Sequence, residues 1–282
     1  MVLSICISFA FFGSIISIPD TPCNRIQIDD NWYEKDILWA FIGRPSNLVV
    51  HRISNTLFFS YTLPDTYSEV DFQLAMINID TRESQIIAGI RGGCAVAIDD
   101  SNDIVYLGGS SGIYTYNMMT KIADYYKENG KNVWSLFYRK NLFYISYPDQ
   151  KLWIEVDGKF SKVKEFEGFE VDNFYVKPNN DIFFANKTGF YNFDDEDMRA
   201  TVVNEMVTVR QISEDAEGKM YVTSNVGVYI EGDNHIMRKI INMKNVFGLA
   251  FDRDNNVIFS DDMSIVKLVP SEIGCLSRDT HW

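Results

Sequence analysis

An internal repeat constrains the fold of this chain more than any other feature of its sequence. Six times, three consecutive apolar or aromatic residues follow a polar turn, at positions 57–59 (LFF), 104–106 (IVY), 142–144 (LFY), 182–184 (IFF), 220–222 (MYV) and 257–259 (VIF). The last residues of successive triplets lie 47, 38, 40, 38 and 37 positions apart. A period of about 40 residues, made of short segments, is typical of the blades of a β-propeller.

Each repeat consists of segments that favour strands over helices, because they are short, β-branched or aromatic, and bounded by turn residues. The segments before the triplet, such as residues 95–98 and 248–251, predict an innermost strand. Those after it, such as residues 112–116 and 189–193, predict a third strand, and residues 85–90 and 235–241 predict a fourth. Four antiparallel strands make one blade, so the sequence predicts an all-β, six-bladed β-propeller.

The last repeat indicates how the ring closes. After residues 268–270 the chain soon ends, which leaves no room for a regular fourth strand, whereas residues 36–41 (DILWAF) precede the first repeat and belong to none. We expect this N-terminal segment to complete the last blade, with both ends of the chain in one sheet. The alternative is an open two-sheet sandwich, which does not usually show this period.

The N-terminus has the pattern of a secretory signal peptide. Residues 2–18 form an apolar run that ends before Pro19 and Asp20, and we expect cleavage after Ser17. The segment lacks a basic first region, and a short membrane anchor is the alternative, although an anchor needs about 20 apolar residues. The prediction is therefore a signal peptide at 1–17, a single propeller domain at 18–282, and a secreted, extracellular protein without membrane attachment after cleavage.

Cysteine usage agrees with an oxidising compartment. Cys6 lies in the signal segment, and Cys94 lies in the apolar run CAVAI, where a buried thiol is the simplest interpretation. Cys23 and Cys275 remain, one near each mature end, and we expect them to form a disulfide. Such a bond would constrain nearly the whole unfolded chain, for which the loop-entropy estimate approaches ~5 kcal/mol. An intermolecular bridge from an odd thiol is the alternative.

The charge balance argues against polyanionic partners. The formal net charge is −13 and the sequence contains no basic run, whereas nucleic acids and anionic membranes are bound through clustered Lys and Arg. We expect no nucleic-acid partner and a monomeric protein.

Motifs for catalysis or cofactor binding are missing. A hydrolytic propeller of the gluconolactonase or paraoxonase kind would hold a divalent metal in its channel, but Asp172 and Asn173 form only a scattered set. The DRDNN run at 252–256 opens like a calcium loop, yet Val257 and Met263 stand where that loop needs Gly and Glu. We expect no catalytic residue, metal or cofactor.

Two further features of the polar residues bear on function. The histidines, His51, His235 and His281, are too widely spread to suggest a base paired with a nucleophile. Asn186, in the sequence NKT, is a predicted N-glycosylation site in a turn between strands.

The aromatic content, 20 Phe, 15 Tyr and 5 Trp, is mostly expected to fill the wedge-shaped core between blades. A minority near inner strands could instead stack on a flat ligand, and we take Trp134, Tyr175 and Phe247 as candidates. Arg210 is a charge in an inner-strand setting, where a ligand carboxylate or a structural ion pair could be its partner.

Several runs form a recognisable series: NTLFFSY at 55–61, IRGG at 90–93, VYLGG at 105–109 with GIYTY at 112–116, and GLAFD at 248–252 with IVKLVP at 265–270, together with the position of Cys275. In these runs the chain resembles the insect ommochrome-binding proteins. The similarity spans most of the mature chain and keeps order and spacing.

The resemblance implies a secreted haemolymph or epidermal protein that carries tryptophan-derived pigments such as xanthommatin and does not catalyse a reaction on them. Because propellers host many functions, two alternatives stay open. One is a metal-dependent, gluconolactonase-like lactonase, and the other is a propeller that binds proteins.

Overall fold

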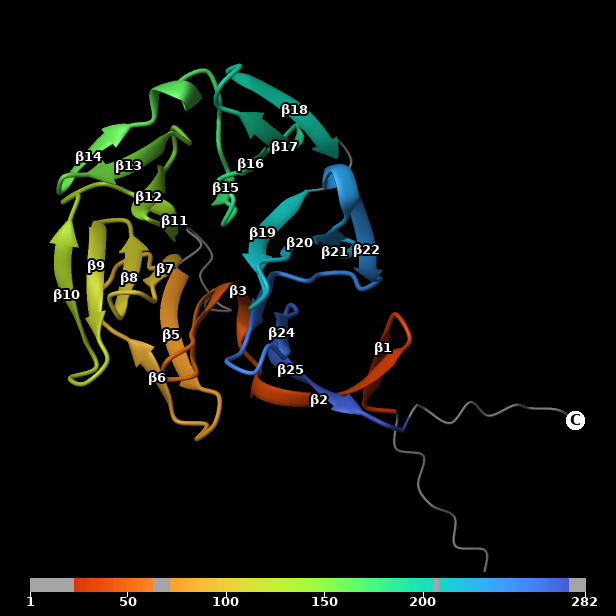
Figure 1. Cartoon of the computed structure of the whole chain (residues 1–282). Helices are drawn as coiled ribbons and strands as arrows, with labels where there is room; N and C mark the ends of the chain where they lie inside the picture. Colours follow the sequence, from red (N-terminus) through yellow and green to blue (C-terminus); the bar gives the residue numbers. More distant parts are fainter. Residues whose placement is uncertain (1–22, 63–71, 205–207, 274–282) are drawn as a thin grey trace, which may run out of the picture.

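The computed structural model describes residues 23–62, 72–204 and 208–273, and these form six β-sheets arranged in a ring (Figure 1). Two single turns of 3-10 helix, η1 (Lys164–Phe166) and η2 (Asp233–His235), are the helical elements of this part of the chain. The predicted all-β, six-bladed propeller is therefore confirmed.

Five of the sheets are regular four-stranded antiparallel blades. Blade 1 contains β3 (Gly43–His51), β4 (Thr56–Thr62), β5 (Phe72–Asn78) and β6 (Ser84–Ile87), and blade 2 contains β7 (Ala95–Asp99), β8 (Ile104–Gly109), β9 (Gly112–Asn117) and β10 (Ile122–Lys127). Blade 3 contains β11 (Val133–Arg139), β12 (Asn141–Ser146), β13 (Leu152–Val156) and β14 (Lys159–Lys162). Blade 4 contains β15 (Asn173–Val176), β16 (Ile182–Asn186), β17 (Gly189–Asp194) and β18 (Arg199–Asn204), and blade 5 contains β19 (Val209–Glu214), β20 (Met220–Ser224), β21 (Gly227–Glu231) and β22 (Met237–Ile241).

The sixth blade joins the two ends of the chain. It contains β23 (Gly248–Phe251), β24 (Val257–Ser260), β25 (Ser264–Ser271), β2 (Asn31–Ala40) and, at its outer edge, β1 (Arg25–Ile28). The N-terminal strand expected at residues 36–41 lies largely within β2, which pairs antiparallel with β25 from Trp32 opposite Ser271 to Ala40 opposite Ser264. Figure 1 shows β2 and β25 side by side at the seam.

The repeated triplets are the second strands of the blades, and their continuous apolar character has a packing cause. In β4, Phe58 belongs to the hydrophobic cluster between blades 1 and 2, whereas Leu57 and Phe59 belong to the cluster between blades 6 and 1. All three side chains are fully buried. Since both faces of each blade pack on a neighbouring blade, a strand in the middle must be apolar on both sides.

Asn and Asp make the turns that follow the inner strands, as expected from the sequence. The Asp99 carboxylate accepts hydrogen bonds from the backbone N–H groups of Ser101 and Asn102 at 3.1 and 3.2 Å. Asp103 and Asn255 adopt positive φ angles of 58° and 65°, a conformation that these residue types tolerate well.

Two expected fourth strands are shorter than predicted. The fourth strand of blade 1, expected at residues 85–90, already ends at Ile87. His235 lies in η2, and the fourth strand of blade 5 begins only at Met237. The positive φ angles of Asn234 and His235 interrupt the extended backbone there.

The six inner strands begin on one face of the ring and end on the other. We call these the start face and the end face. Trp134 and Phe247 lie at the start face, where strands β11 and β23 begin, and Arg52 and Lys140 lie at the end face, just after β3 and β11. The Asn- and Asp-rich turns lie on the end face.

Some predictions concern residues outside the described part of the chain. The signal peptide at 1–17 and Cys275 both lie there, so cleavage and the Cys23–Cys275 pairing stay predictions.

Asn186 lies at the end of β16, where its side-chain oxygen accepts a hydrogen bond from the Thr188 hydroxyl at 2.7 Å. Cys94 is a free, buried cysteine, and burial raises the pKa of its thiol to about 12.

A buried ion pair in blade 6 makes stability depend on pH. The Asp252 carboxylate is fully buried, 2.5 Å from Lys267 Nζ. Burial alone raises the pKa of Asp252, but hydrogen bonds from Lys267 and Asn256 outweigh it, so the net pKa lies below the usual value. The stabilisation is complete above the unfolded-state pKa of about 4 and is lost as pH falls through the folded-state value.

We therefore expect Asp252→Asn to lower the free energy of unfolding by about 3 kcal/mol at neutral pH, because it leaves Lys267 without its counter-charge. Urea denaturation at a series of pH values measures this, and the difference from wild type should shrink below about pH 4. A constant difference down to pH 2 would contradict the assignment.

The predicted disulfide has a separate test. Peptide mapping without reductant should recover one linked pair that contains Cys23 and Cys275, and Cys275→Ser should destabilise the protein by several kcal/mol, up to ~5. Cys94→Ala, the control, should leave the linked pair intact. Recovery of Cys23 bonded to a second chain would favour the intermolecular alternative.

Candidate functional site

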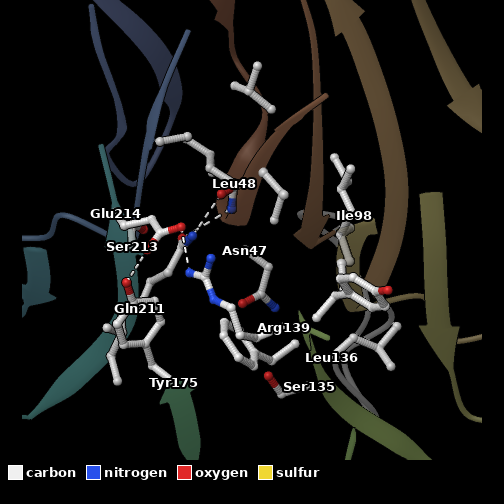
Figure 2. Close-up of a pocket in the computed structure, with 18 of the residues that line it drawn as sticks. Asn47, Leu48, Ile98, Ser135, Leu136, Arg139, Tyr175, Gln211, Ser213 and Glu214 are labelled. Carbon is white, nitrogen blue, oxygen red and sulfur yellow. Dashed lines mark hydrogen bonds and ion pairs between the residues drawn. The ribbon is translucent and has the colours of Figure 1, made fainter. Parts of the chain in front are cut away.

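A cavity of about 480 Å³ lies in the middle of the ring and opens toward the end face. All six inner strands line it, from Asn47, Ala95, Ser135, Asn173, Gln211 and Leu249 at its inner end to the turns of Arg52, Asp100 and Lys140 at its mouth. Figure 2 shows side chains from β3, β11 and β19 converging on this space. A central cavity of this kind is where a propeller can enclose a small molecule.

Gln211 closes the inner end by joining three blades. Its side-chain N–H donates to the carbonyl of Leu48 at 2.7 Å, and its side-chain oxygen accepts from the backbone N–H groups of Leu48 and Leu249 at 3.1 and 3.3 Å. Gln211 is 8% exposed. The amide therefore acts as a crosslink between the inner strands of blades 1, 5 and 6, and we call this contact the Gln211 bridge.

A glycine permits this close approach. A Cβ atom at Gly248 would lie 2.6 Å from a Leu48 methyl carbon and 2.9 Å from the Gln211 side-chain oxygen. A larger residue at this position would force the Leu48 or Gln211 side chain to shift, so Gly248 suits the bridge through its small size and not through its backbone angles.

An ion pair with a tyrosine forms one wall of the cavity. Arg139 Nη2 lies 2.6 Å from Glu214 Oε1, and Arg139 Nε donates to the carbonyl of Val176 at 3.1 Å. The Tyr175 hydroxyl donates to the other oxygen of Glu214. Burial raises the pKa of Tyr175, and the neighbouring carboxylate raises it further. Tyr175 is therefore a neutral hydrogen-bond donor here.

Four aromatic residues, Phe137, Tyr138, Phe174 and Phe251, are among the other residues that line the cavity. Phe137 packs against Phe174 and Tyr175, with ring centroids 5.9 and 5.4 Å apart. Tyr138 is stacked on Tyr106 at 6.1 Å, and burial together with a hydrogen bond to Asp99 raises the pKa of Tyr138 to about 12. These rings are held by one another, so the wall they present is preformed.

The structure separates the four residues expected at a ligand site. Tyr175 lines the central cavity, whereas Trp134, Arg210 and Phe247 do not. Arg210 and Phe247 come together on the start face, with the guanidinium carbon 3.9 Å from the ring centroid. Trp134 lies at the same face and packs against Phe72 and Tyr147, at 6.0 and 5.7 Å.

Two of these residues share a structural cause. The pairing register shifts between Val133 and Ser135 and again between Val209 and Gln211, so Trp134 and Arg210 are the extra residues of β-bulges. A bulge redirects its side chain away from the regular alternation, which explains why neither follows the strand into the cavity.

Gln211, Arg139 and Glu214 were not predicted as site residues from the sequence. A signal was present, because Arg139 and Glu214 are the charged last residues of the inner strands β11 and β19. Their pairing joins residues 75 positions apart, and nothing in the local pattern specifies that partner.

The described ranges contain no group of three or more His, Cys, Asp or Glu side chains placed to hold a metal. Asp172 accepts a hydrogen bond from Gln150, and Asn173 donates to the carbonyl of Val209 at 3.3 Å. His51 Nε2 lies 2.6 Å from Asp103, and His235 Nδ1 lies 2.6 Å from Glu231.

None of the helices in residues 23–62, 72–204 and 208–273 has the length and apolar character needed to cross a membrane.

These features define a class: a six-bladed propeller closed through its terminal strands, with a partly aromatic cavity in its centre. The chain is 32% identical over 253 residues to the ommochrome-binding protein of Manduca sexta, covering 88% of this chain and 91% of that protein. It belongs to the family of that protein. No family model matches the chain.

Solved structures show the same fold at low sequence identity. A gluconolactonase from Xanthomonas campestris superposes with a TM-score of 0.66 at 10% identity, covering 88% of this chain and 92% of that one. Regucalcin, a calcium-binding protein from Agrobacterium tumefaciens, superposes with a TM-score of 0.63 at 13% identity, covering 84% and 95%. The WD40 propeller domain of Doa1 gives 0.58 at 11% identity, covering 85% and 97%.

The Gln211 bridge makes a prediction about stability. Gln211→Ala leaves the N–H and carbonyl of Leu48 and the N–H of Leu249 without partners, so it should lower the free energy of unfolding by about 3 kcal/mol. Urea denaturation measures this. Gln27→Ala on the exposed face of β1 is the matched control and should change stability by less than about 0.5 kcal/mol. Equal effects of the two variants would contradict the bridge.

Proposed function

We propose that this protein binds an ommochrome-type pigment, or a related small aromatic ligand, in the central cavity and carries it without breaking a bond. The observation that carries the proposal is the family relationship to a protein named for ommochrome binding, 32% identical over most of both chains. The cavity supplies a place for such a ligand.

The size and lining of the cavity support a flat aromatic guest. Ligand pockets for drug-sized molecules hold roughly 300 to 1,000 Å³, and this cavity holds about 480 Å³. Phe137, Tyr138, Phe174 and Phe251 contribute to its lining. Aromatic faces favour offset stacking with a planar ring system, beyond the free energy gained by burying its surface.

The polar groups of the cavity support binding over catalysis. Arg139, Glu214, Tyr175 and Gln211 each have a hydrogen-bond partner within the protein. Groups held in this way orient a ligand through fixed donors and acceptors, and they need not exchange a proton with it. Arg139 already pairs with Glu214, so a ligand would meet it as a fixed hydrogen-bond donor and not as a free positive charge.

The same proposal includes the setting of the protein. We take it to be a monomer, secreted into haemolymph after removal of residues 1–17. The apolar N-terminal segment, the terminal cysteines and the sequon at Asn186 support an extracellular protein.

Titration with xanthommatin, followed by its visible spectrum, tests the proposal. We expect a saturable spectral shift. Ser135→Phe places a ring in the cavity and should weaken binding about tenfold or more, because the ligand and the new ring cannot occupy the same space. Ser161→Phe makes the same change on the exposed outer strand β14 and should bind as wild type does.

Absence of saturable binding would overturn the pigment function. Equal affinities of the Ser135→Phe and Ser161→Phe variants would move the site away from the central cavity. Hydrolysis of gluconolactone that disappears on metal removal would instead favour the lactonase alternative, and recovery of a stoichiometric protein partner without chromophore would favour the interaction alternative.

A further inference from the structure

Arg210 lies on the start face, and one of its guanidinium nitrogens donates no hydrogen bond within the described residues. Its Nη1 atom is buried and has no hydrogen-bond partner among the described residues. No ion pair within the described ranges includes Arg210 either. Other arginines, Arg139, Arg238 and Arg253, do pair with carboxylates. The side chain as a whole is half-buried, so a solute can approach the guanidinium from its exposed side.

The surroundings of Arg210 are apolar and positive. The guanidinium lies over the ring of Phe247, 3.9 Å from its centroid. Burial lowers the pKa of Arg210, and the charge of Arg44 lowers it further. The position of Arg44 is set by its backbone N–H, which donates to the carbonyl of Asp262 at 3.1 Å.

Such an arrangement is unfavourable unless an anion joins it. Partial burial of a cation without a counter-charge costs solvation free energy, and a second arginine nearby adds repulsion. The chain contains 39 acidic and 26 basic residues, so carboxylates are abundant, yet none of those described pairs with Arg210. The Phe247 ring offsets part of this cost through a cation–π contact and also presents an aromatic face beside the charge.

We propose that Arg210, Phe247 and Arg44 form a second binding site, on the start face, for a planar aromatic carboxylate. The carboxylate accepts hydrogen bonds from the guanidinium of Arg210, with Arg44 adding positive charge, and the aromatic part of the ligand packs beside Phe247. The site is distinct from the central cavity, because Arg210 does not line that cavity and the Gln211 bridge comes next along β19.

The proposal does not depend on the pigment function. The β-bulge between Val209 and Gln211 places Arg210 at this site, because it directs the Arg210 side chain away from the cavity while the Gln211 side chain forms the Gln211 bridge. Two neighbouring residues of one strand therefore have different surroundings: Arg210 lies on the start face, and Gln211 closes the inner end of the cavity.

Isothermal titration with 2-naphthoate and with its neutral amide tests the site. Wild type should bind 2-naphthoate at a single saturable site. It should bind the amide at least about tenfold more weakly, since the amide carries no charge. Arg210→Gln should lose about tenfold or more in affinity for 2-naphthoate and should no longer distinguish the two compounds. Arg199→Gln removes the same charge from the exposed outer strand β18 and should bind as wild type does.

Two further variants separate this site from the central cavity and from a folding defect. Ser135→Phe should leave 2-naphthoate binding unchanged while it weakens xanthommatin binding. Arg210→Gln should melt at the same temperature as wild type or higher when no ligand is present, because it removes a half-buried cation that has no counter-charge. Absence of saturable 2-naphthoate binding, equal binding by Arg210→Gln, or its loss in Ser135→Phe would overturn the proposal.

Discussion

The pairing of β2 with β25 is the interaction on which the rest of this structure depends. Without β2, the outer edge of β25 would be unpaired, and an open row of six blades would expose the apolar faces of the first and last blades. The N-terminal strand supplies the outer part of the last blade, and Leu38 on β2 then joins Leu48 and Ile258 in one buried cluster. Six clusters, one between each pair of neighbouring blades, follow from this single closure.

Closure also creates the site. Six inner strands held at a fixed spacing leave a central space that is too wide to fill by backbone contact alone, and side chains decide what remains open. At the inner end the Gln211 bridge draws β3, β19 and β23 together, with Gly248 permitting the approach. Toward the end face the strands stay apart, and aromatic rings with the Arg139–Glu214 pair line the cavity that results.

The two ends of the axis differ in chemistry, although they belong to the same strands. At the end face, the cationic Arg139 is neutralised by Glu214, so the cavity presents fixed hydrogen bonds and aromatic walls to a guest. At the start face, Arg210 has no such partner and is set against Phe247. The bulge in β19 contributes to this difference, because it directs Arg210 away from the cavity that Gln211 lines.

Much of the fold was predictable from sequence, because local pattern and global architecture agree in a repeat protein. The triplets, the Asn and Asp turns and the extra N-terminal segment predicted six blades and a closing strand, since each blade needs an apolar middle strand and each turn needs residues that tolerate positive φ. Of the site, the sequence indicated only residue types: it singled out Tyr175, which lines the cavity, and Arg210 with Phe247, which lie together at the other end. Gln211, Arg139 and Glu214 received their roles only from the tertiary structure, because their partners lie in other blades and a bulge, invisible in an alternating pattern, sets which way each side chain of an inner strand points.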